Sequence, residues 1–309
     1  MVWSTRCKSS WPRLRLRDRA AIIFWMRLAF STNAYTRFSL DEALRGIREA
    51  GFLGVEVLAD EPHAYPGTFS DGDATTVAEE LRGLGLGVSN VNVNCSFGYW
   101  KDAPPEPYFE PSLISPNRRH REDRIELIGK AMKIARILGT RNISITSGRM
   151  LGSMSPVKAA AEFERSMRRV LEMADEERID VGIECEPGLF VEYVAELKEW
   201  IDRLGHPRLG ANLDIGHCQV IGESIPAAIE LLGDRIWNLH VEDIPGRKHY
   251  HLIPGEGTLD WREVKAALLA IDYKRYLTVE LYTHTDEPQV AAEKSFGFLQ
   301  EIFGTDEHR

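Results

Sequence analysis

The feature that most constrains the fold is a strict alternation of short apolar segments with longer amphipathic ones, running from near Met26 to the end of the chain. Short apolar runs predict buried strands, and apolar residues three and four apart predict helices that bury one face. We expect eight strands, at residues 28–33, 54–59, 87–94, 142–147, 180–186, 209–214, 235–242 and 276–281. Each precedes a helix, at residues 40–51, 74–85, 117–139, 155–177, 191–205, 224–233, 260–272 and 288–303.

This order predicts an α/β protein, a single (β/α)8 TIM barrel over residues 26–309, because buried strands separated by helices form parallel βαβ units. A doubly wound sheet is the competing layout. It is disfavoured because no glycine-rich phosphate loop follows the first strand, where "STNAYTRFS" stands instead. The long loop at 95–116 is rich in proline and aromatic residues and follows the third strand. We expect it to lie over the active-site face.

The chain before the barrel has a different composition. Residues 1–19 contain six Lys or Arg side chains and one acid, Asp18, and the apolar run "AAIIFW" follows them. This run is too short for a signal peptide or a membrane span, and Arg27 interrupts it. We therefore expect residues 1–25 to be a flexible basic extension that the barrel does not need. No other stretch reads as a membrane segment.

Charge and cysteine content narrow the classes of function. The net charge of −9 argues against a general nucleic-acid-binding surface, since phosphate contacts need clustered Lys and Arg. The four cysteines show no CxxC spacing, which is typical of reduced thiols in a cytoplasmic protein and not of a disulfide framework or zinc knuckle. We expect a small-molecule partner, with neither nucleic acid nor membrane. The sequence leaves homo-oligomer formation open.

Ionisable residues gather where the last four strands end, and in a barrel the chemistry lies at the carboxyl ends of strands. Strand five ends with Glu184 and Glu186, and strand six ends with Asp214, three residues before His217. His240 and Glu280 end strands seven and eight in the same way. Each residue alone has a plainer explanation: a solvated acid, a histidine hydrogen-bonded in the core, or an Asp that caps a turn. Together they would repel one another without a cation, and a mixed carboxylate and imidazole set suits Mn²⁺, Mg²⁺, Co²⁺ or Zn²⁺.

The segments "LDIGH", "LHVED…HLIPGEGTLDW" and "LTVELY" resemble those of the xylose isomerase-like TIM barrels over roughly residues 27–303. That superfamily includes sugar and sugar-phosphate isomerases, ketose 3-epimerases, inosose dehydratases and endonuclease IV. The resemblance implies one divalent metal ion, with Mn²⁺ as our first expectation. The ligands that it implies are Glu184, Asp214, His240 and Glu280.

The resemblance also implies residues that contact the substrate. The histidine of the Asp-x-x-His turn is His217, and a basic residue after strand seven is best matched by Arg247. His251 matches a position where endonuclease IV carries a further metal ligand. We expect His249, His251 and Glu256 to line the pocket, with Gly255 and Gly257 permitting a tight turn. Glu186 and Asn94 complete the candidate substrate-binding set.

The predicted activity is that of a metal-dependent isomerase or epimerase acting on a sugar, sugar phosphate or cyclitol. Glu184 and Glu280 are the candidate acid and base, working through an enediolate. A dehydratase or other lyase acting on an oxo-sugar or inosose is the alternative. Endonuclease activity is disfavoured, because Asn94 and Ser147 stand where strands three and four would need histidines. A further alternative is a non-catalytic carbohydrate-binding barrel. The intact set of four candidate metal ligands argues against it, because such a protein would not need them.

Overall fold

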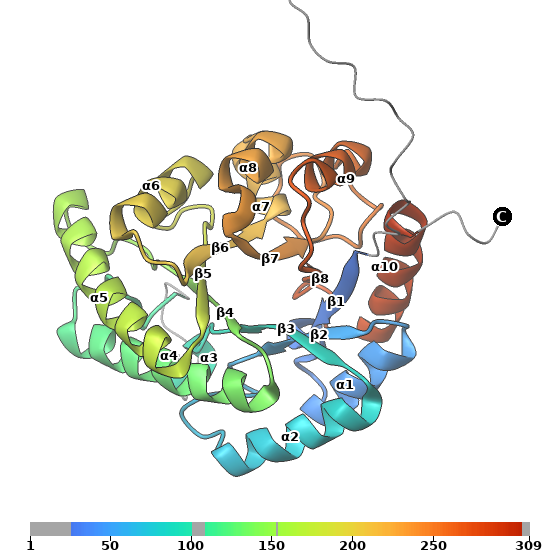
Figure 1. Ribbon diagram of the computed structural model, residues 1–309, viewed down its shortest axis with the longest axis horizontal. Coiled ribbons are helices and arrows are strands. Elements are labelled where there is room, and N and C mark those ends of the chain that lie inside the picture. Colours follow the sequence, from blue (N-terminus) through green and yellow to red (C-terminus); the bar gives the residue numbers. More distant parts are fainter. Residues whose placement is uncertain (1–25, 101–108, 153, 305–309) are drawn as a thin grey trace, which may run out of the picture.

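A computed structural model describes residues 26–100, 109–152 and 154–304. Its eight parallel strands close into a barrel in the order β1-β2-β3-β4-β5-β6-β7-β8, and helices surround it (Figure 1). The expected TIM barrel is confirmed. The extension expected at residues 1–25 lies outside the described residues. The strands are β1 (Arg27–Ser31), β2 (Gly54–Leu58), β3 (Gly87–Asn92), β4 (Asn142–Thr146), β5 (Asp180–Glu184), β6 (Leu209–Asp214), β7 (Ile236–Val241) and β8 (Tyr276–Val279).

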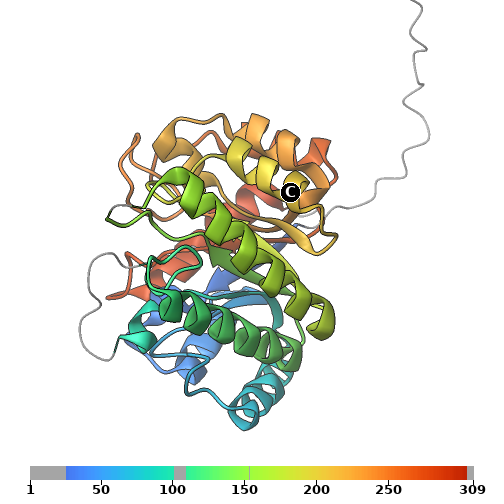
Figure 2. The same ribbon diagram turned by 90° about the vertical axis from the view of Figure 1, so that its left-hand side faces the viewer.

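The eight expected helices are all present. They are α1 (Leu40–Glu49), α2 (Asp71–Leu84), α4 (Arg118–Leu138), α5 (Pro156–Glu177), α6 (Val194–Leu204), α8 (Ile225–Leu232), α9 (Trp261–Ala270) and α10 (Pro288–Phe303). Ser39 and Ser70 open α1 and α2 with capping boxes, and Gly139 ends α4 in the left-handed conformation. Figure 2 shows α4 and α5 packed side by side on the outside of the barrel.

Four short helical segments were not predicted by the periodicity. They are the 3₁₀ turns η1 (Thr32–Tyr35) and η2 (Gly233–Arg235) and the helices α3 (Ser96–Tyr99) and α7 (Ile215–Ile221); three follow strands, and η2 lies between α8 and β7. A segment this short does not span enough turns to show an apolar periodicity. Part of the expected loop at 95–116 forms α3, and its residues 101–108 lie outside the described part of the chain.

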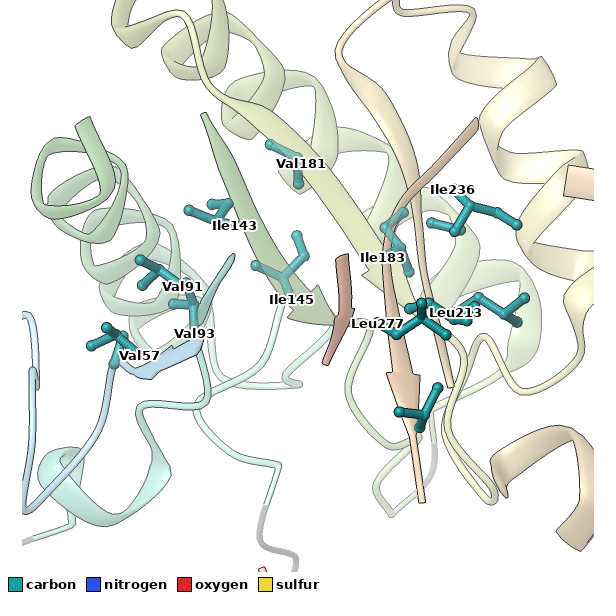
Figure 3. Packing of buried hydrophobic residues seen from close by; sticks show 14 of the residues in the cluster. Val57, Val91, Val93, Ile143, Ile145, Val181, Ile183, Leu213, Ile236 and Leu277 are labelled. Carbon is teal, nitrogen blue, oxygen red and sulfur yellow. The ribbon is translucent and has the colours of Figure 1, made fainter. Parts of the chain in front are cut away.

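The strands have two faces of different chemistry. Alternate residues such as Ile143 and Ile145 in β4, and Val181 and Ile183 in β5, are buried in the apolar core (Figure 3). The strand positions between them, such as Asn142, Ser144 and Thr146 in β4 and Glu184 in β5, face the barrel interior, as the period-two geometry of a strand requires. The barrel interior is therefore lined with polar side chains near its carboxyl-terminal end.

Candidate metal centre and active site

Four ionisable side chains converge at the carboxyl ends of β5, β6, β7 and β8. Glu184 and Asp214 are the last residues of β5 and β6, His240 pairs with Asp214 in the β6–β7 register, and Glu280 follows β8. All four are buried. One ligand atom from each lies within 4.8 Å of the ligand atoms of the other three. The predicted ligand set therefore meets in space.

The oxygens of Asp214 show that this cluster fits a cation. One oxygen, Oδ1, accepts a hydrogen bond from the backbone N–H of His217 at 2.7 Å and caps the first turn of α7. The other, Oδ2, is buried and has no hydrogen-bond partner. A carboxylate oxygen in this position is costly unless a cation faces it. Three carboxylates and one imidazole are a donor set suited to Mn²⁺, Mg²⁺, Co²⁺ or Zn²⁺.

The buried surroundings of this cluster shift the pKa values of its members. Burial and the neighbouring carboxylates of Glu184, Glu56 and Asp214 raise the pKa of Glu280 well above its usual value, although His240 opposes them. Burial would lower the pKa of His240, but the surrounding carboxylates, Glu56 first, raise it well above the usual histidine value. These shifts arise from an excess of buried negative charge, which a divalent cation would neutralise.

His217 lies beside the cluster and faces the cavity. Its Nδ1 is 3.1 Å from the carbonyl oxygen of Cys185, and its Nε2 is 3.6 Å from Glu186 Oε2. Burial would lower the pKa of His217, but Asp214, Glu186 and Glu184 raise it to about 9. Burial raises the pKa of Glu186 to about 7. His217 and Glu186 are thus two neighbouring groups with perturbed pKa values beside the candidate metal centre, a pattern common at functional sites.

A cavity of about 640 Å³ opens over this centre. The predicted residues Glu184, Glu186, His217, Glu280 and Asn94 line it, as does His249. The sequence prediction missed further lining residues, among them Asn33, Asn92, Thr146, Arg149 and Tyr282. Asn92 is the most informative of these, because its Nδ2 donates to Glu280 Oε1 at 3.2 Å. The alternation of polar and apolar residues in "NVNVN" was the available signal.

Asp243 organises the histidine-rich segment at 238–261. Its carboxylate accepts hydrogen bonds from the backbone N–H groups of Ile244, Gly255 and Leu259 and from Trp261 Nε1, at 2.9–3.0 Å. A Cβ at position 257 would lie 2.2 Å from Asp243 Oδ1, so only glycine fits there. Gly255 has a φ of 91°. The two glycines thus allow the loop to wrap around Asp243.

Three residues predicted to contact substrate are placed elsewhere. The exposed Arg247 donates from Nε to the carbonyl oxygen of Val220, at the end of α7, and is not among the residues that line the cavity. Glu256 is also exposed and pairs with Lys294 of α10 at 3.2 Å. His251 is buried behind the cavity wall, where its Nδ1 is 2.9 Å from the carbonyl oxygen of Glu280. The wrapping of the loop around Asp243 directs these residues away from the opening.

A closed (β/α)8 barrel with a carboxylate and histidine cluster at the ends of its last four strands defines a recognisable class. The chain belongs to the xylose isomerase-like TIM barrel family, whose sequence profile matches residues 44–302. The fructoselysine 3-epimerase of Escherichia coli O157:H7 is 23% identical over 287 residues, covering 91% of this chain and 100% of that protein.

Solved structures share the fold of this chain. A D-psicose 3-epimerase crystallised in the presence of D-fructose has a TM-score of 0.73 at 15% identity, covering 91% of this chain and 100% of that one. The IolI protein with a bound zinc atom also has a TM-score of 0.73 at 15% identity, covering 90% and 98%. Among the described helices, none has the length and apolar character needed to cross a membrane.

Proposed function

We propose that this protein is a divalent-metal-dependent epimerase or isomerase of a carbohydrate that carries a carbonyl group. The observation that carries the proposal is the convergence of Glu184, Asp214, His240 and Glu280, with ligand atoms within 4.8 Å of one another. The similarity to enzymes named as sugar epimerases supports it. The cavity is large enough for a monosaccharide, since sites for small ligands commonly span roughly 300–1,000 Å³.

The chain's own residues supply the acid and base. A divalent ion held by Glu184, Asp214, His240 and Glu280 would polarise the carbonyl oxygen and the adjacent hydroxyl oxygen of a bound sugar. One of Glu184 and Glu280 removes the proton from the carbon next to the carbonyl, giving an enediolate, and the other returns a proton. Action on opposite faces of one carbon gives epimerisation, whereas transfer between neighbouring carbons gives aldose–ketose isomerisation.

Neighbouring residues hold the substrate and the acid–base pair. His217 reaches the cavity with Nε2 and binds a sugar oxygen next to the reacting carbon. Asn92 holds Glu280 through the hydrogen bond to Oε1. Arg149 is the only Lys or Arg among the described residues that line the cavity, and it is exposed. This single basic residue favours an unphosphorylated sugar over a sugar phosphate.

The experiment is incubation of the purified protein with ketoses, fructosamines and inososes in deuterated water, followed by NMR. The protein is first stripped of metal and then loaded with Mn²⁺. An epimerised product carrying solvent deuterium at the reacting carbon supports the proposal. Loss of water from the substrate would instead identify a lyase, and turnover without deuterium would favour a hydride shift or shielded proton transfer. Equal activity with and without metal would exclude the metal-dependent route.

A further inference from the structure

Glu56, on β2, is buried inside the barrel next to the metal centre, and its side chain is completely inaccessible to solvent. Its Oε2 lies 2.7 Å from His240 Nε2. In the barrel order β2 and β7 are not neighbours, so this contact crosses the interior. A buried carboxylate that reaches across a barrel to a single imidazole needs a specific reason, because its desolvation is costly.

The two ring nitrogens of His240 have different surroundings. Nε2 faces Glu56, and an ionised carboxylate can only accept, so Nε2 carries the proton. Nδ1 faces the other proposed ligands, at 3.2 Å from Glu184 Oε1 and 3.7 Å from Glu280 Oε2. The Asn212 amide nitrogen lies within hydrogen-bond distance of both ring nitrogens, at 3.2 Å from Nδ1 and 3.5 Å from Nε2.

Glu56 is itself held in place by amides from two other strands. Asn90 of β3 donates to Glu56 Oε2 at 2.6 Å, and Asn238 of β7 donates to the same oxygen at 3.4 Å. Asn142 donates to Asn90 Oδ1 at 2.9 Å, which orients the Asn90 amide. Within the part of the chain that the structure describes, Glu56 is outside every carboxylate and imidazole group close enough to share one ion. The ionisable side chain that it contacts directly is therefore His240.

We propose that Glu56 is a positioning residue for the metal centre: it accepts the Nε2–H of His240 and so turns Nδ1 toward Glu184, Asp214 and Glu280. A histidine that binds a metal through one nitrogen commonly donates the other N–H to a carboxylate, which fixes its tautomer and ring orientation. The polar side chains of β2, β3 and β7 inside the barrel thereby fix the orientation of the His240 ring. This inference rests on the proposed metal centre and adds a residue from outside the predicted site.

The direct test is the affinity of the whole chain for Mn²⁺, measured on metal-free protein by competition with a fluorescent chelator. Glu56→Met removes the acceptor while keeping the length of the side chain. It is expected to raise the Kd for Mn²⁺ by about tenfold to a hundredfold, the usual cost of losing such a partner. Glu56→Gln keeps an oxygen that can accept the N–H, so it should restore most of the affinity. If Glu56→Met fails to fold, the role of Glu56 is tested with Glu56→Gln and with ¹⁵N spectra of histidine-labelled protein.

A matched control is Glu110→Gln, because Glu110 is also buried but hydrogen-bonds to Ser112 and lies near His120, away from the metal centre. Its Kd should equal that of the wild type. A second readout is the ¹⁵N spectrum of histidine-labelled, zinc-loaded protein, in which His240 should show a metal-bound Nδ1 and a protonated Nε2.

If His240 binds the metal through Nε2, or if folded Glu56→Met keeps the wild-type Kd for Mn²⁺, the role of Glu56 is wrong while the proposed function still stands. A wild-type chain that binds no metal would overturn the proposed function, and this inference with it.

Discussion

The two halves of the barrel present different chemistry to the same cavity. Strands β5 to β8 deliver the proposed ligand set Glu184, Asp214, His240 and Glu280. Strands β1 to β4 and their loops contribute a mixed wall, with amides and hydroxyls such as Asn33, Asn92, Asn94 and Thr146, several apolar side chains, and the charged residues Asp60, Glu61 and Arg149. One half thus carries the candidate metal centre, and the other offers hydrogen-bonding groups of the kind that sugar hydroxyls can use. The halves are joined by the contacts Asn92–Glu280 and Glu56–His240.

The comparison predicts that the largest losses of activity come from the charged half. Glu184→Gln and Glu280→Gln keep the size of the side chain but remove the base, so each should lower kcat by about a hundredfold to ten-thousandfold. Metal content must be measured in each variant before the rate is interpreted, because both residues are also proposed ligands. A variant that keeps both its metal and near-normal kcat would remove that carboxylate from the acid–base pair.

Among the cavity residues supplied by β1 to β4 and their loops, Asn92 should affect kcat more than Asn94. Asn92→Ala leaves Glu280 Oε1 without its amide donor, and hydrogen bonds to charged groups are worth enough to lower kcat by about tenfold to a hundredfold. Metal content should stay the same. Asn94→Ala is the matched control, since Asn94 is exposed at the cavity and should affect KM more than kcat. Equal effects of the two variants on kcat would argue that Asn92 does not act through Glu280.

The charge imbalance between the halves should make the metal-free protein sensitive to pH. The pKa of His217 is raised to about 9, so its charged form stabilises the fold. This contribution is full below the unfolded value of about 6.5 and is lost as the pH rises through 9. In EDTA, Tm should therefore fall by several degrees between pH 6.5 and 9.5. His217→Gln should reduce this fall of Tm with pH. If Tm falls equally in the variant, other titrating groups cause the pH dependence.

The smallest effects are expected at residues that the loop around Asp243 turns away from the cavity. Arg247→Ala and Glu256→Gln change exposed side chains with partners on α7 and α10, so kcat/KM should stay within about twofold of the wild type. The assay is steady-state kinetics on whichever carbohydrate the deuterium experiment identifies. A tenfold loss in either variant would mean that this loop closes over the substrate and brings the residue to it.

The charged half could be predicted from sequence because its residues stand at equivalent positions, at or just beyond the ends of regular strands. Once the strand–helix alternation is read, Glu184, Asp214 and Glu280 follow directly. The cavity residues from β1 to β4, such as Asn92, could not be predicted in the same way, since amides in strands also serve as hydrogen-bonding groups in the core. Glu56 reads as one polar residue in "GVEVL", and only the closure of the barrel brings it to His240.

Arg247 and Glu256 were predicted to contact substrate, and the structure places both at the surface, outside the residues that line the cavity. The family resemblance suggested Arg247 and the position after strand seven suggested Glu256, but the hydrogen bonds to Asp243 set the path of the loop. A carboxylate with four donors drawn from residues 244–261 is a tertiary arrangement that no local pattern contains.

Asp243 and Leu252 also exchange two backbone hydrogen bonds of 2.8 Å, which close the segment between them at its base. A segment tied in this way can change its inner sequence without moving its ends. Residues 245–250, which include His249 at the cavity, can therefore diverge while the strand carrying His240 keeps its place. Sequence changes between Asp243 and Leu252 would thus alter the cavity wall at His249 without displacing the proposed metal ligands.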